Sequence, residues 1–263
     1  MTLGTADQAA GTVRRQVGIP SPRTPSTADP IVLVAHGSRD PRSAATMREL
    51  GRRVGMRWSF GVSTAFLDFN APSVSAALRE LPAGRRAIVV PALLTKAYHG
   101  RVDLPEILST VTTPSRVTAV LGPAEPGEAA HPLLMAALLR RLSELDVGAD
   151  AVALIAAGTT DARARSTVEG VARQLASQMD VACAVGYASA SSPTAGDAVA
   201  RLRASGARRV VAASYFLAAG RLHDAAAASA RQAGAIGVAA PLGAADELVE
   251  LIVARARDGT TQS

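Results

Sequence analysis

The stretch Val32-Leu33-Val34-Ala35-His36-Gly37-Ser38-Arg39-Asp40-Pro41 is the most informative part of this chain. An apolar run ends abruptly in a histidine, which is followed by a glycine and a serine. This pattern is typical of a buried parallel strand that brings a polar side chain to the carboxyl edge of a sheet. The stretch therefore predicts an α/β fold with a candidate reactive residue, His36, at a strand end.

Two more polar side chains follow apolar runs in the same half of the chain. Asp68 comes directly after the run at 62–67, and His99 follows the run at 87–94. Because the carboxyl ends of parallel strands lie at one edge of a sheet, these two side chains and His36 could converge on one divalent metal ion. We predict that all three are catalytic and metal-binding residues.

The chain repeats itself once, at an offset of 121 residues. The stretch 32–42 is matched by 153–163, and three of its residues recur unchanged: Gly37, Asp40 and Arg42 become Gly158, Asp161 and Arg163. The offset is too long for a solenoid repeat, so we interpret it as the duplication of a whole α/β unit.

Each copy alternates strands with helices, which predicts a parallel sheet flanked by helices. In the first copy we expect strands near 31–35, 61–67, 87–94 and 116–121 and helices near 41–56, 72–81 and 103–111. In the second we expect strands near 151–156, 181–187, 208–217 and 235–239 and helices near 162–178, 193–204, 223–233 and 244–257. A further helix is expected near 131–145. The predicted fold class is thus α/β, with two similar lobes from an internal duplication.

The predicted domain organisation follows from these elements. We expect a disordered N-terminal segment at 1–29, an N-terminal lobe with the active site at 30–122, a linker and helix at 123–150, a C-terminal lobe at 151–257 and a flexible tail at 258–263.

The two copies differ where chemistry is expected. At the 121-residue offset His36 becomes Ala157 and Asp68 becomes Ser189, while His99 maps near Leu222 or His223 when a small gap is allowed. A histidine needed only for folding should persist in both copies about as often as not, so its replacement by alanine favours a reactive role for the first copy. For His223, near a helix start, a structural role is favoured.

Composition narrows the function classes. The single cysteine, Cys183, excludes an internal disulfide, a Cys-rich zinc site and an iron–sulfur cluster held by this chain alone, and it suits a reducing cytoplasm. The net charge of +6 comes from scattered arginines, which indicates a solvated surface first, an anionic substrate second and nucleic acid last. No apolar stretch is long enough for a membrane span. We predict a cytoplasmic protein with neither nucleic acid nor membrane as partner.

Several common sites are not supported. The chain has no phosphate-binding loop, no Gly-x-Gly-x-x-Gly after the first strand and no Gly-x-Ser-x-Gly elbow. Phosphotransferases that form phosphohistidine usually show Arg-His-Gly, whereas Ala35 precedes His36 here.

The motifs together resemble the class II tetrapyrrole chelatases, in particular the sirohydrochlorin chelatases and the related cobalt chelatases of cobalamin synthesis. The resemblance is carried by 33–41, by 65–73 and by 89–94 leading to His99 and 103–105, and it covers about residues 31–240. It is closest to the long two-domain form, which implies two similar lobes that face each other across a cleft with the tetrapyrrole between them.

The resemblance also implies roles for individual residues. His36 and His99 stand at the positions of the metal-handling histidines, and Asp68 stands where the family often has a longer glutamate, so that it can act through water. Substrate contacts are expected from five residues near these strand ends: Ser38, Arg39, Asn70, Lys96 and Arg101.

The function implied is that of a metal chelatase, a lyase of porphyrin biosynthesis that inserts Fe²⁺ or Co²⁺ into sirohydrochlorin for sirohaem or cobalamin. Iron is preferred because the chain lacks other cobalamin-pathway features. The metal is then a substrate, and no organic cofactor is needed. A monomer could hold a complete cleft because both copies are in one chain. The alternatives are a non-catalytic metal or tetrapyrrole carrier and, less favoured, a phosphohistidine phosphotransferase.

Overall fold

The computed structural model describes Met1 and residues 29–82, 84–96 and 104–258. The predicted disordered segment at 1–29 and the predicted tail at 258–263 lie almost entirely outside these residues, as do the predicted site residues His99 and Arg101.

The N-terminal lobe is built on a four-stranded parallel sheet with the order β2-β1-β3-β4. Its strands are β1 (Ile31–Ala35), β2 (Val62–Phe66), β3 (Ala87–Pro91) and β4 (Ser115–Val117). Its helices are α1 (Pro41–Arg57), α2 (Val74–Arg79) and α3 (Leu104–Ser109). Every residue of the central strand β1 is buried, as expected for a parallel strand covered on both faces.

The C-terminal lobe repeats this topology with the sheet order β6-β5-β7-β8, again all parallel. Its strands are β5 (Ala151–Ala156), β6 (Ala182–Tyr187), β7 (Val210–Tyr215) and β8 (Gly237–Val238). Its helices are α5 (Ala162–Met179), α6 (Ala195–Ala204) and α7 (Arg221–Gln232). The predicted duplication and the predicted α/β fold are therefore confirmed.

The predicted helix at 72–81 is shorter in the structure. Helix α2 begins at Val74 because the hydroxyl of Ser73 caps it, accepting a hydrogen bond from the backbone N–H of Ala76. Pro72, which follows a cis peptide bond, lies before this cap.

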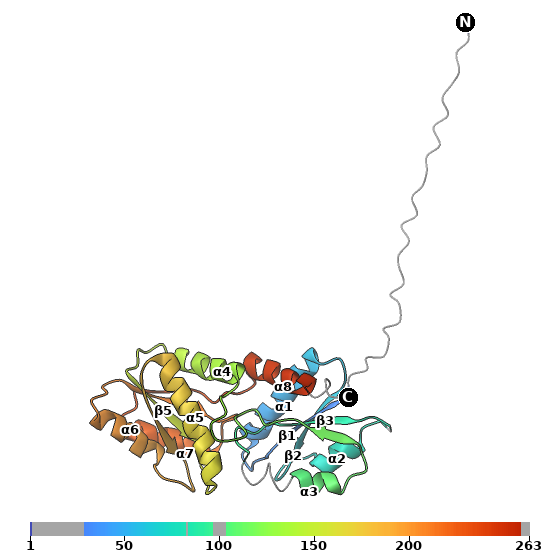
Figure 1. The fold of residues 1–263 in the computed structure, drawn as a ribbon, viewed down its shortest axis with the longest axis horizontal. Coiled ribbons are helices and arrows are strands. Elements are labelled where there is room, and N and C mark those ends of the chain that lie inside the picture. The colour runs from blue at the N-terminus through green and yellow to red at the C-terminus, as the bar shows by residue number, and fades with distance from the viewer. Residues whose placement is uncertain (2–28, 83, 97–103, 259–263) are drawn as a thin grey trace.

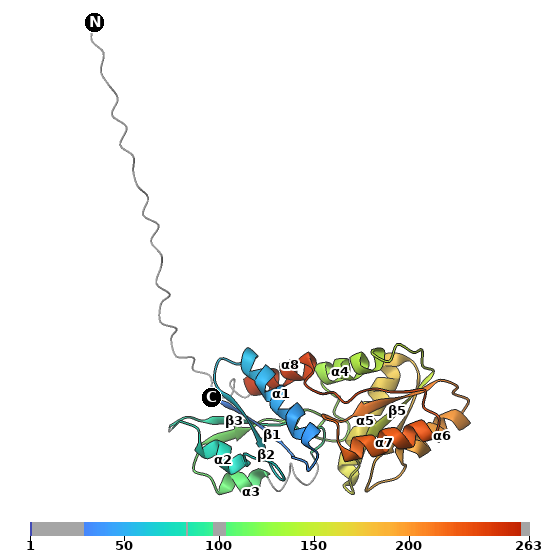
Figure 2. The same cartoon turned by 180° about the vertical axis from the view of Figure 1, so that it is seen from behind.

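Two helices join the lobes along one side of the molecule (Figures 1 and 2). These are α4 (Pro132–Ser143) and α8 (Asp246–Asp258). Helix α8 follows the second lobe in the sequence, yet it packs against α1, α4 and β3, while α4 also packs against β7. One apolar core runs through both lobes and includes Leu33, Leu154 and Leu251. The lobes consequently share a core instead of being two separately packed bodies.

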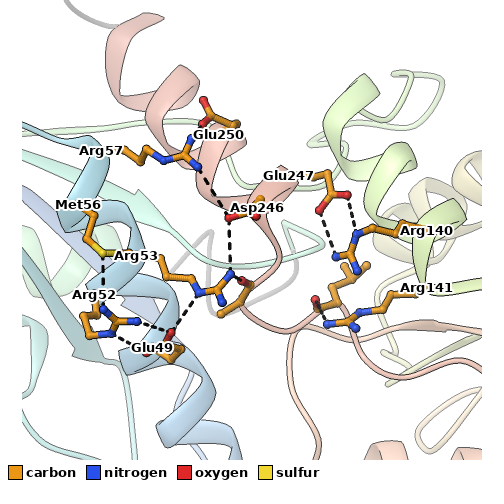
Figure 3. A network of polar contacts seen from close by, with 12 residues as sticks. Glu49, Arg52, Arg53, Met56, Arg57, Arg140, Arg141, Asp246, Glu247 and Glu250 are labelled. Carbon is orange, nitrogen blue, oxygen red and sulfur yellow. Dashed lines mark hydrogen bonds and ion pairs between the residues drawn. The ribbon is translucent and has the colours of Figure 1, made fainter. Parts of the chain in front are cut away.

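A polar network surrounds the start of α8 (Figure 3). Arg140 donates two hydrogen bonds to Glu247, at 2.7 and 3.1 Å. Arg53 donates to the carbonyl of Ala244 at 2.8 Å, and Arg141 donates to the carbonyl of Leu242, two residues earlier in the same loop, at 3.0 Å. Because these last two hydrogen bonds are made to backbone carbonyls of the loop that leads into α8, they hold that loop between the helices α1 and α4.

Candidate active site between the two lobes

A cleft of about 500 Å³ lies between the lobes, at the carboxyl ends of the central strands of both sheets. Its walls in the first lobe include His36, Ser38, Arg39, Phe69 and Leu94. Its walls in the second lobe include Ala157, Tyr187, Tyr215, Leu222 and His223. In parallel α/β sheets ligands bind outside the carboxyl ends of the strands, so this cleft is the candidate active site.

His36 is placed by a close contact between two strand ends. Its carbonyl accepts a hydrogen bond of 2.9 Å from the N–H of Asp68. Gly37 has a φ of +94°, and a Cβ on it would lie 1.8 Å from the carbonyl oxygen of Asp68. Only glycine fits such an approach. The half-buried imidazole of His36 is thereby held at the cleft wall.

The second lobe keeps this turn without the histidine. Gly158 has a φ of +92°, and a Cβ on it would lie 1.9 Å from the carbonyl oxygen of Ser189. The N–H of Ser189 donates to the carbonyl of Ala157 at 3.1 Å. The turn therefore forms with alanine in place of His36, which supports a chemical and not an architectural role for that histidine.

Asp68 is exposed and lies beside the cleft rather than in its wall. Its Oδ1 accepts a hydrogen bond of 2.7 Å from the N–H of Phe69, whose ring does line the cleft. Within the described ranges, no three His, Cys, Asp or Glu side chains gather closely enough to hold a metal ion. The predicted triad includes His99, which falls outside those ranges.

Ser38 and Asn70 brace the loop after β1. The Oδ1 of Asn70 accepts from the N–H of Ser38 at 2.8 Å, and the hydroxyl of Ser38 accepts from the N–H of Asp40 at 3.0 Å. In the second lobe Thr159 and Ser191 make the same contacts, with the Ser191 hydroxyl accepting from the Thr159 N–H at 3.0 Å. Since the braces recur in the lobe without His36, they are structural features of the turn; Ser38 also lines the cleft.

The predicted cationic contacts differ in their surroundings. The guanidinium of Arg39 lies over the ring of Phe69, 5.2 Å from its centroid, and lines the cleft. The Nζ of Lys96 lies 3.8 Å from Oε1 of Glu125.

Two tyrosines of the second lobe are site residues that the sequence analysis missed. The hydroxyl of Tyr215 donates to the carbonyl of Leu94, in the other lobe, at 2.9 Å, and burial raises the pKa of this phenol. Tyr187 also lines the cleft, and burial raises its pKa to about 12. The repeat holds a weak signal for Tyr187, because it takes the place of Phe66 at the same offset.

His223 lines the cleft, but its ring nitrogens face protein groups. Nε2 lies 3.1 Å from the hydroxyl of Ser214, which itself donates to the carbonyl of Ala239 at 2.6 Å. Nε2 must therefore carry the hydrogen of this contact. Nδ1 lies 3.4 Å from Oδ1 of Asp224, and burial is the main cause that lowers the pKa of the ring. These contacts agree with the structural role favoured for His223.

An ion pair closes one edge of the cleft. Arg42 lies 2.7 Å from Oδ2 of Asp40 in its own lobe and 2.6 Å from Oδ2 of Asp224 in the other lobe. Hydrogen bonds from Arg42 hold the pKa of Asp40 at about 2. Asp40 also accepts from the backbone N–H of Arg42 and so caps α1. One arginine thus links a helix cap to the opposite lobe.

The arrangement offers an imidazole on a largely apolar surface between two fixed walls. A neutral imidazole can bind a first-row divalent metal or accept a proton near neutral pH. Both of the described walls come from one chain.

Comparisons with known proteins show the family and the fold of this chain. A family model described as CbiX matches residues 30–145 and 151–259. Sirohydrochlorin cobaltochelatase of Priestia megaterium is 28% identical over 196 residues, which cover 71% of this chain and 63% of that protein. Sirohydrochlorin cobaltochelatase of Methanococcus maripaludis is 32% identical over 81 residues, which cover 30% of this chain and 56% of that protein. The chain thus spans less than two thirds of these curated relatives.

Solved structures share the fold. SirB from Bacillus subtilis with Fe³⁺ superposes with a TM-score of 0.73 at 19% identity, covering 89% of this chain and 98% of that chain. CbiX, described as the terminal enzyme for biosynthesis of siroheme in denitrifying bacteria, superposes with a TM-score of 0.61 at 21% identity, covering 89% of this chain and 99% of that chain.

Across the described residues, no helix combines the length and apolar character needed to cross a membrane.

Proposed function

Because the chain belongs to the CbiX family, whose model matches both of its lobes, we propose that it is a sirohydrochlorin chelatase, which inserts Fe²⁺ or Co²⁺ into the macrocycle. The observation that carries this proposal is the position of His36. Its imidazole stands at the wall of the interlobe cleft, at a turn that the second lobe forms equally well with Ala157.

The reaction exchanges two pyrrole protons for one divalent metal ion. His36 and His99 hold the incoming ion, and as the macrocycle displaces the two imidazoles from the metal, each imidazole accepts one of the two pyrrole protons. Asp68 adds negative charge near His36, because its backbone N–H donates a hydrogen bond to the carbonyl of His36 at the strand end. Ligands limited to these side chains leave positions open through which the macrocycle takes over the ion.

Other observations support the proposed substrate, metals and compartment. The cleft walls are largely apolar, which suits the face of a flat macrocycle, and the relatives that match the chain carry the name sirohydrochlorin cobaltochelatase. Fe³⁺ and cobalt are the ions named for the SirB structures, so both metals belong in the test. We place the reaction in the reducing cytoplasm, which the single cysteine suits.

The test is anaerobic absorbance spectroscopy of sirohydrochlorin mixed with Fe²⁺ or Co²⁺. The wild type should accelerate the appearance of the metallated spectrum, and the His36→Ala variant should proceed at the uncatalysed rate. The Ser189→Ala variant alters the equivalent turn of the second lobe and should remain active.

The competing functions predict other results. A carrier would bind the metal or the macrocycle tightly without accelerating insertion. A phosphotransferase would incorporate labelled phosphate at His36. Either result would replace the chelatase proposal.

A further inference from the structure

Three guanidinium groups gather at the edge of the cleft where α1 and α7 begin. Arg39 and Arg221 line the cleft, and Arg42 bonds both nearby carboxylates, Asp40 at 2.7 Å and Asp224 at 2.6 Å. Arg221 acts on Asp40 only through its charge. In the part of the chain that the structure describes, no carboxylate forms an ion pair with Arg39 or Arg221, so this edge carries excess positive charge.

The duplication supplies a second edge for comparison. There Arg163 lies 2.7 Å from Oε2 of Glu125, whose Oε1 is 3.8 Å from Lys96. The counterpart of Arg39 at the 121-residue offset is the neutral Thr160. A glutamate therefore pairs with both Lys96 and Arg163, while the first edge keeps two guanidinium groups without an ion-pair partner among the described residues.

The wall beside Arg221 is apolar and partly exposed. The second lobe lines the cleft there with small or aliphatic residues such as Ala218 and Ala219. At the mouth, Leu222 is 46% exposed, and Phe69 of the first lobe is 51% exposed. Large apolar side chains exposed at the mouth of a cleft mark a ligand-binding surface.

We propose that Arg39 and Arg221 bind carboxylates on the rim of the macrocycle, whose face lies against the apolar wall of the second lobe; this rests on the proposed function. The lobe that lacks His36 thus contributes Arg221 to recognition, while the lobe that contains His36 supplies Arg39 and the chemistry. The ligand class is a flat apolar molecule with carboxylates at its edge.

The position of Arg39 suits this task. Its guanidinium lies over the ring of Phe69, and this cation–π contact orients the plane of the group. The N–H groups at the edge of that plane remain available for bidentate bonding to a carboxylate. Arg221 is exposed at the first turn of α7, on the opposite lobe, so the two arginines can bind carboxylates from two sides of one edge.

The test measures binding separately from insertion. Metal-free sirohydrochlorin is titrated into the wild type, Arg39→Gln, Arg221→Gln and Arg221→Lys, and the dissociation constant is read from its absorbance and fluorescence. Arg231→Gln is the matched control, since Arg231 is exposed in the last turn of the same helix α7. The ester of sirohydrochlorin, in which every carboxylate is blocked, is titrated in parallel.

Each glutamine variant should raise the dissociation constant about tenfold, as expected for loss of a charge-assisted bond. Arg221→Lys should fall between Arg221→Gln and the wild type, and Arg231→Gln should match the wild type. The ester should bind the wild type and Arg221→Gln equally. In insertion assays KM should rise while kcat is retained.

Two results would overturn the proposal: unchanged binding in Arg39→Gln and Arg221→Gln, or an ester that still distinguishes the wild type from Arg221→Gln. Failure of the proposed function would give a different result. The macrocycle would then bind with this dependence on the two arginines, but neither the wild type nor any variant would accelerate metal insertion.

Discussion

The hydroxyl of Tyr215 donates a hydrogen bond of 2.9 Å to the backbone carbonyl of Leu94, which lies in the opposite lobe. A Cβ on Gly122 would lie 1.9 Å from that carbonyl oxygen and 2.6 Å from that hydroxyl, so three segments meet at this point. The contact joins the walls of the cleft and limits how far they can separate.

Replacing Tyr215 with phenylalanine should therefore destabilise the fold. The carbonyl of Leu94 would lose its partner while its surroundings stayed apolar, which costs about 1–2 kcal/mol in the free energy of unfolding. Urea unfolding followed by circular dichroism measures it. Tyr187→Phe is the control: its buried hydroxyl has no hydrogen-bond partner among the described residues, so its removal should cost little. Equal losses in both variants would contradict a specific role for the interlobe bond.

Gly37→Ala should destabilise the protein by more than about 2 kcal/mol, because alanine tolerates a φ of +94° poorly and its Cβ would collide with the carbonyl of Asp68. Gly158→Ala should cost a similar amount for the same reasons. Thermal melting of both variants is the measurement. Gly61→Ala, where nothing lies within 4 Å of the added Cβ, should melt close to the wild type. If Gly37→Ala melted at the same temperature as Gly61→Ala, the turn at Gly37 would accommodate the added methyl group without loss of stability.

Metal binding can be followed without the macrocycle. Co²⁺ titrations monitored by visible absorbance should show affinity losses of at least about tenfold for His36→Ala and for His99→Ala. Asp68→Asn should lose less, because the carboxylate of Asp68 already accepts a hydrogen bond from Phe69 and is exposed to solvent. Asp146→Asn is the control, because this exposed aspartate precedes β5 and so lies at the opposite end of that strand from the cleft. An Asp68 variant as weak as the histidine variants would make the carboxylate a direct ligand.

Acid should weaken the edge of the cleft held by Asp40. Hydrogen bonds from Arg42 lower the pKa of this carboxyl from 3.8 to about 2 in the folded chain. A lowered folded pKa means that the stabilisation is complete above about pH 4 and is lost as the pH falls through 2. Melting temperatures measured between pH 5 and pH 2 should accordingly converge for the wild type and Asp40→Asn, which keeps a helix-capping side chain. Parallel curves across this range would exclude the linkage.

Secondary structure followed closely from the sequence because strands and helices of this chain are strongly patterned. The fully apolar run at β5, predicted at 151–156, has the observed bounds Ala151–Ala156. The end of the strand predicted at 87–94 was wrong. Strand β3 ends at Pro91, although apolar residues continue beyond it. Hydrophobicity marks burial, and the residues after Pro91 are apolar because they line the cleft, as Leu94 does.

The site was only partly predictable. His36 and Arg39 stand out because they follow a strand directly, and the structure places both at the cleft. Tyr215 and Arg221 could not be predicted, because each lies at the interface between the lobes, and the pattern of a single strand or helix does not show which residues of the other lobe it will face. Asn70 stays a predicted substrate contact, and its second role, in which its amide oxygen braces a loop that has an equivalent in the other lobe, is visible only in the structure.

The position of α8 also constrains the order in which the molecule can fold on the ribosome. This helix is the last element that the structure describes, yet its apolar residues Leu248 and Ile252 are fully buried in the core shared with α1 and β3. The N-terminal lobe therefore leaves the exit tunnel with part of its apolar surface uncovered and must wait for the C-terminal lobe to be translated. Until α8 is made, the apolar residues of α1 and β3 that it covers stay exposed to solvent.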